Sequence, residues 1–166
     1  MEGAWPSMPD IVELILADHM RIRELLGGLG DMAGDGEPGD DRLAKEWEVL
    51  AGLLEVHLDA AEEIAYPALF SGPAHGARPM AQVVADHADV REAMDEARLH
   101  PAGSPLWWLA IRAARATAIS HIDAIESGPL ARFRWETSPR EREILGRQWV
   151  GFVTARASDG YAAADG

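Results

Sequence analysis

The chain has 166 residues, no cysteine and a formal net charge of −13 at pH 7. This length suits one domain with a substantial buried core. The lack of cysteine excludes disulfides, iron–sulfur clusters and thiolate zinc sites, and it is consistent with the cytoplasmic location that we expect. The acidic charge argues against nucleic acid and anionic membrane surfaces as partners, and no apolar run reaches the roughly 18 residues that cross a bilayer.

Five helical segments and no strand are predicted. The first begins at Pro9 and ends near Gly27, where a glycine-rich loop follows. The others are expected at residues 41–70 with a bend at Pro67, 79–99, 105–127 and 139–157. Gly128-Pro129 is expected to end the fourth segment, and Ser138 to Glu141 form a capping box before the fifth. We expect one domain over residues 1–157, with a four-helix core at about 9–128, and a disordered tail over 158–166.

A short internal repeat relates the first two helices to the third and fourth. Ala-Asp-His occurs at residues 17–19 and again at 85–87, and His-x-Asp occurs at 57–59 and again at 121–123. Two similar helical hairpins of this kind stack face to face. The repeat therefore predicts an all-α fold, an up-and-down antiparallel four-helix bundle with an additional C-terminal helix. That amphipathic fifth helix is expected to pack across the bundle or to form a homodimer contact.

Each of the four bundle helices carries one histidine within an apolar stripe. The residues three, four and seven positions away from these histidines are mostly Val, Ile, Leu or Ala. A single buried histidine would simply bond to a nearby polar group. Four near mid-helix are expected to converge in the bundle centre and share one metal or cofactor: His19, His57, His87 and His121. His75 and His100 lie beside glycine or proline and are expected to be solvated.

With these motifs the sequence resembles the haemerythrin-like family of cation-binding helical domains. The resemblance rests on Asp18-His19, on His57 through Tyr66-Pro67, on Asp86-His87 and on His121-x-Asp123. It implies non-haem iron, in many members a di-iron pair, held by the four histidines. It also implies a small-molecule ligand such as oxygen, nitric oxide or peroxide. Whether the protein is an enzyme stays open from the sequence.

The sequence departs from the family pattern at both bridging glutamates. The family places them four residues after the histidines of the second and fourth helices, where this chain has Ala61 and Ile125. Glu62 and Glu126 follow one residue later and are expected to point about 140° away, unless a π-bulge turns them inward. They are candidate metal ligands if such a bulge is present.

Three occupants remain open for such a centre. They are a di-iron site completed by displaced glutamates, a single divalent ion, and haem with axial histidines. The alternatives to an iron protein are a haem-binding bundle with axial histidines that acts as an enzyme on a small organic substrate, and a cofactor-free interaction module.

Four charged residues lie near the histidines in sequence. Arg23 and Arg91 each follow a histidine by four residues. They are candidate cofactor-binding residues that would contact an anion such as a haem propionate or a substrate carboxylate, or else they pair with Asp and Glu at the surface. Asp18 and Asp86 each precede a histidine by one residue, about 100° off its face, and are expected to be solvated.

Overall fold

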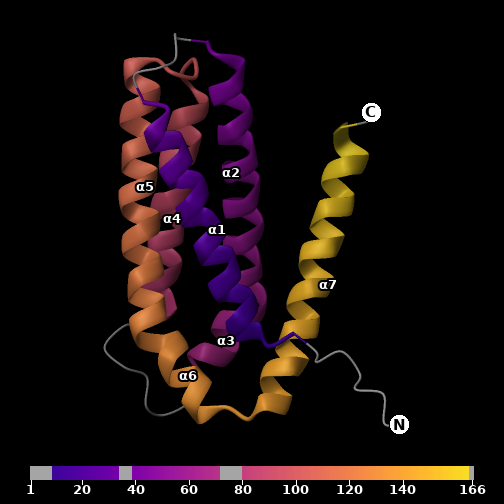
Figure 1. Ribbon diagram of the computed structural model, residues 1–166. Helices are drawn as coiled ribbons and strands as arrows, with labels where there is room; N and C mark the ends of the chain where they lie inside the picture. Colours follow the sequence, from indigo (N-terminus) through magenta and orange to yellow (C-terminus); the bar gives the residue numbers. More distant parts are fainter. Residues whose placement is uncertain (1–8, 34–38, 72–79, 165–166) are drawn as a thin grey trace.

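The computed structural model describes residues 9–33, 39–71 and 80–164 (Figure 1). Four long helices form its antiparallel bundle: α1 (Ile11–Asp31), α2 (Asp41–Ala60), α4 (Met80–Arg98) and α5 (Pro105–Ile125). The predicted all-α bundle with an additional C-terminal helix is confirmed. No helix of the described residues is long and apolar enough to cross a membrane.

The helices begin where short polar side chains cap them. Asp10 accepts a hydrogen bond from the Val12 amide, and Asp40 accepts one from the Arg42 amide. Ser104 does the same for Trp107 at the start of α5. These caps satisfy amides that the first turn of a helix leaves without partners.

Two of the helical segments contain a π-helical turn near one end of the bundle. η1 (Ala61–Ala65) follows α2 and continues into α3 (Tyr66–Leu69). η2 (Glu126–Leu130) follows α5 and continues into α6 (Ala131–Glu136). The expectation that Gly128-Pro129 ends the fourth segment is therefore wrong, because the wider π-turn accommodates the proline and the helix goes on.

Two other predicted boundaries differ from the structure. α1 extends to Asp31, since Gly27, Gly28 and Gly30 are all helical once the helix packs against its neighbours. α7 (Pro139–Ala164) also runs further than the predicted end at residue 157, so most of the predicted disordered tail is helical. The capping box of Ser138 and Glu141 is confirmed by reciprocal hydrogen bonds.

The apolar core consists of two clusters along the bundle axis. One contains Ile22, Leu54 and Val90, and the other contains Ile15, Ala60 and Val83. The four bundle histidines lie in sequence between residues of the first cluster and residues of the second. They therefore form a polar layer between two apolar parts of the core.

α7 lies outside the four-helix bundle, beside α1 and α2 (Figure 1). Arg142 holds α7 against the start of α1, because its Nε donates a hydrogen bond to Asp10 at 2.6 Å. Trp149 is buried against the bundle, with its ring 5.6 Å from that of His57. The predicted packing of this helix on the bundle is thus observed, and a homodimer contact through it stays a prediction.

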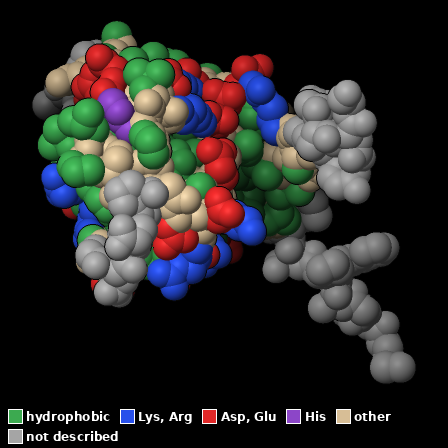
Figure 2. Space-filling view, turned by 90° about the horizontal axis from the view of Figure 1, so that it is seen from above, with side chains coloured by type: hydrophobic (Ala, Val, Ile, Leu, Met, Phe, Trp, Pro, Cys, Tyr) green, Lys and Arg blue, Asp and Glu red, His purple; other side chains and the backbone are tan. Residues whose placement is uncertain are grey.

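Figure 2 shows the molecule from above the view of Figure 1. Acidic and basic side chains are interspersed on this face.

Gly146 allows α7 to cross the start of α1. A Cβ atom built on Gly146 would lie 1.9 Å from the carbonyl oxygen of Pro9, which is backbone and cannot move aside cheaply. We expect Gly146→Ala to reduce the free energy of unfolding by about 1–3 kcal/mol through this overpacking. Urea denaturation followed by circular dichroism measures the change.

Gly151→Ala on the same helix is the matched control, because nothing lies within 4 Å of its added methyl. It should leave stability unchanged or raise it by up to about 1 kcal/mol, the usual helical preference for alanine. Equal effects of the two substitutions would contradict the close crossing of α7 and α1.

Candidate metal centre

The structure brings the four bundle histidines together. Each is buried, with an exposed fraction of at most 3%: His19, His57, His87 and His121. The rings of the first two are 4.9 Å apart and those of the last two are 4.5 Å apart, both in edge-to-face contact. The layer therefore contains two touching imidazole pairs, one from α1 and α2 and one from α4 and α5.

Two glutamates bind imidazole nitrogens of this layer. Glu126 Oε1 lies 2.9 Å from His19 Nδ1, and Glu62 Oε1 lies 2.7 Å from His87 Nδ1. Regular α-helices would have turned both carboxylates away, but both glutamates lie in π-helical turns. A π-turn holds one residue more than an α-turn, so a side chain five places after a histidine stays near its face.

These glutamates bind the outer nitrogen of each ring rather than face the centre. Ala61 and Ile125, where the sequence resemblance led us to expect bridging carboxylates, are apolar and buried. A role of Glu62 and Glu126 as direct metal ligands stays a prediction, and the contacts in the structure make them partners of the histidines.

Two aspartates complete the pattern. Asp18 Oδ2 lies 3.1 Å from His57 Nδ1, and Asp86 Oδ2 lies 3.6 Å from His121 Nδ1. The expectation that both aspartates are solvated is wrong, because each belongs to the helix next to the histidine that it faces. The 100° offset from their own histidines directs them towards the neighbouring helix instead.

Both arginines near the layer are held by carboxylates of the chain itself. Arg23 donates to Glu126 at 2.8 Å and to Asp123 at 2.7 Å. Arg91 donates to Glu62 at 2.8 Å and to Asp59 at 2.9 Å. The sequence left two roles open for these arginines, an anion contact or pairing with Asp and Glu, and the structure shows the pairing. Each guanidinium group positions a glutamate, and the glutamate in turn positions a histidine.

The inner nitrogens of one histidine pair face each other. His87 Nε2 and His121 Nε2 are 3.0 Å apart, and the hydroxyl of Tyr66 lies 2.8 Å from the first and 3.1 Å from the second. Tyr66 was not predicted as a site residue, although it stood in the family motif. Its place on the helix after η1 depends on the π-turn, which periodicity alone does not reveal.

Burial keeps these imidazoles neutral. Desolvation, followed by repulsion from the other histidines, lowers the pKa of His19 to about 2. Desolvation and the charge of His57 or His87 lower the pKa values of His87 and His121 to about 3. Neutral imidazole is the form that binds metals, so all three are ready to do so at pH 7.

The donor set suits a metal ion. A carboxylate at Nδ1 favours the proton on that nitrogen and leaves a lone pair on Nε2. Two Nε2 atoms only 3.0 Å apart are compatible when one of them carries the hydrogen of a hydrogen bond, and a metal ion could take the place of that hydrogen. No three His, Asp or Glu side chains of the described residues already form a complete metal-binding cluster. The layer therefore supplies the nitrogens, but its side chains would have to move to surround an ion.

The remaining histidines lie apart from this layer. His100 follows α4 and pairs with Glu96 near the surface at 2.9 Å. His75 lies outside the described residues.

Fold and site together define a helical bundle with a metal-suited layer of imidazoles. The Hemerythrin HHE cation binding domain family matches residues 10–129, more than half of the chain. The chain belongs to this haemerythrin family, as the sequence motifs predicted. Searches of curated proteins and of solved structures give no match.

Acid should destabilise the metal-free protein well before its carboxylates are protonated. The unfolded chain takes up protons at His19, His87 and His121 below pH 6.5, whereas the folded chain does not until about pH 3 or lower. This part of the stability is therefore complete above pH 6.5 and is lost as pH falls. Each histidine contributes about 1.4 kcal/mol per pH unit.

Urea denaturation of chelator-treated protein at pH 7.5, 6 and 5 measures this loss. His100→Ala is the control and should keep the same slope, because His100 is near the surface. A free energy of unfolding that is constant from pH 7.5 to pH 5 would contradict the burial of neutral imidazoles.

Proposed function

We propose that this protein is a non-haem iron protein that binds or reacts with oxygen, nitric oxide or peroxide. The ligands would be the Nε2 atoms of the four buried histidines. One observation carries the proposal: the Nε2 atoms of His87 and His121 face each other at 3.0 Å while carboxylates lie beside their Nδ1 atoms. Membership of a cation-binding family supports the same reading.

The packing favours a bare metal ion over haem. Haem would have to fit between rings whose centres are only 4.5 and 4.9 Å apart. The small residues that could have made room for it are packed within the core, among them Ala60, Ala61 and Ala118. A macrocycle would therefore require the bundle to open, whereas a single ion or an ion pair needs small side-chain movements.

A cofactor-free interaction module is also less well supported. Burying four imidazoles costs free energy, and the carboxylates offset this cost only at Nδ1. Metal binding would provide a partner for Nε2 of His19 and His57 and would replace the contacts that His87 and His121 make with each other and with Tyr66. The arrangement resembles metal-binding histidines, whose second nitrogen bonds to a carboxylate.

Tyr66 distinguishes this centre from one bridged by two carboxylates. Bound iron would supply redox chemistry and Lewis acidity. The Tyr66 hydroxyl would hold a proton beside the nitrogens of His87 and His121, or would bind the ion as an oxygen donor. In the other half of the repeat, the place 64 residues later is Leu130, so the oxygen donor stands on one side of the layer.

Replacing a layer histidine tests the proposed ligand set. We expect His87→Ala to lower the iron bound per chain at least tenfold after expression with iron, because one of the facing nitrogens is lost. Elemental analysis with circular dichroism, to verify folding, measures this. His100→Ala should bind as much iron as the unchanged protein.

The absorption spectrum of the same samples distinguishes non-haem iron from haem. Iron without a Soret band agrees with the proposal, whereas a Soret band would establish haem. A folded protein that takes up neither iron nor haem would contradict both and favour the interaction module.

Tyr66→Phe tests the proposed role of the Tyr66 hydroxyl at the iron site. The variant should keep its iron, since four imidazoles remain, but it should change the visible spectrum and the affinity for nitric oxide. Phe70→Leu is a suitable control, because Phe70 packs on the Tyr66 ring at 5.5 Å without a polar group. Identical spectra of Tyr66→Phe and the unchanged protein would show that the hydroxyl does not contact the iron or its ligand.

A further inference from the structure

The internal repeat places two surface clefts at corresponding positions. Residues of α4 correspond to residues of α1 that come 68 earlier, as His87 does to His19. Residues of α5 correspond to residues of α2 that come 64 earlier, as His121 does to His57. The cleft between α1 and α5 includes Arg23, Leu26, Ile119 and Asp123. The corresponding residues line the cleft between α2 and α4: Arg91, Met94, Glu55 and Asp59. Each cleft thus serves as an internal comparison for the other.

The α2–α4 cleft is filled by its own charges. Arg98 donates to Glu55 across the cleft and to Asp95 at 2.9 Å. These ion pairs join its two walls, and a volume of only about 250 Å³ remains. Its charged side chains already pair with one another, so they do not need an external ligand.

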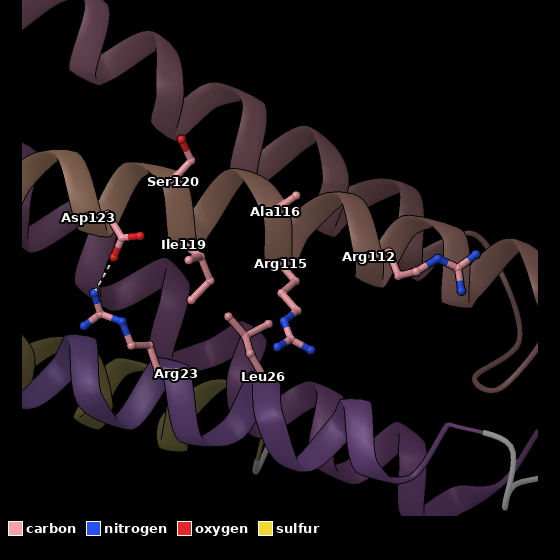
Figure 3. A pocket seen from close by; sticks show the side chains of 8 residues that line it. All are labelled: Arg23, Leu26, Arg112, Arg115, Ala116, Ile119, Ser120 and Asp123. Carbon is pink, nitrogen blue, oxygen red and sulfur yellow. Dashed lines mark hydrogen bonds and ion pairs between the residues drawn. The ribbon is translucent and has the colours of Figure 1, made fainter.

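The α1–α5 cleft lacks all three of these residues and is open. Gly27 stands in place of Asp95, Gly30 in place of Arg98 and Ile119 in place of Glu55. The cleft has a volume of about 940 Å³. A Cβ atom on Gly30 would lie 3.0 Å from the guanidinium of Arg115, so the glycine leaves space for this side chain. In Figure 3, Arg115 extends from α5 towards Leu26 of α1.

The open cleft also has an excess of positive charge. Arg112 and Arg115 line it, where the other half of the repeat has Glu48 and Ala51. Neither arginine makes an ion pair with a described residue. Asp123, the carboxylate among the described lining residues, is already bound to Arg23 (Figure 3). Both guanidinium groups are exposed and have no carboxylate of the described residues beside them, so they attract anions.

We propose that the α1–α5 cleft binds a small organic oxyanion with an apolar body. Its carboxylate or phosphate group would pair with Arg112 and Arg115, which offer planar, always charged donors. Its apolar part would lie on Leu26, Ala116 and Ile119. The volume lies within the range of small-molecule sites, about 300–1,000 Å³. This site goes beyond the iron centre and does not require it, although Arg23 joins the two through Glu126.

Calorimetric titration of the full chain tests this site with defined probes. Octanoate and octyl phosphate distinguish the two head groups, and acetate and inorganic phosphate test the need for an apolar body. We expect at least one octyl anion to bind at one per chain, at least tenfold more tightly than its short counterpart. The better octyl probe then identifies the head group.

Two kinds of variant locate the binding. Arg112→Ala with Arg115→Ala should weaken it at least tenfold, whereas Arg98→Ala, in the α2–α4 cleft, should leave it unchanged. If the double variant does not fold, Gly30→Arg with Ile119→Glu tests the same site, because it copies the charges that close the other cleft. No binding of either octyl anion at millimolar concentration would overturn the proposal. So would binding that is unaffected by these changes, or short anions that bind as tightly as long ones.

Discussion

The pairing of each buried imidazole with a carboxylate from a neighbouring helix is the interaction on which the rest of this structure depends. The partners follow one another around the bundle, from α1 to α2, α4, α5 and back to α1. Three of the contacts are hydrogen bonds that offset part of the cost of burying a polar ring and direct its other nitrogen inward, and the fourth, between Asp86 and His121, is a longer contact of 3.6 Å. The same four contacts therefore tie the helices together and prepare a site of nitrogen donors.

The π-turns and the repeat explain both the symmetry of the site and its exceptions. Each π-turn brings a glutamate five places after a histidine back to the bundle, where Arg23 or Arg91 holds it. The two halves then differ at single positions. Tyr66 gives one half a hydroxyl beside the inner nitrogens, and Gly30 with Arg115 opens an arginine-lined cleft on the other.

Much of this arrangement could be predicted from the sequence, because it follows from helical periodicity. The apolar stripes predicted the bundle and the inward histidines, and the family motifs predicted the family. The partners of the histidines could not be predicted with straight helices, since a one-residue π-turn changes which face Glu62 presents. Asp18 was misjudged because an offset of 100° was taken to mean solvent, when a neighbouring helix occupies that direction. Pro67 and Pro129 were the available signals of both π-turns.

Nuclear magnetic resonance of the imidazole nitrogens tests the central claim most directly. Protein labelled with ¹⁵N-histidine can be titrated with Zn²⁺, a diamagnetic ion that imidazole binds well. The account predicts that the Nε2 signals of His19, His57, His87 and His121 shift on metal binding while their Nδ1 atoms stay protonated, and that His100 is unaffected. The account would be contradicted if the Nε2 signals of these four residues did not change when zinc is added, or if the Nδ1 signals shifted instead.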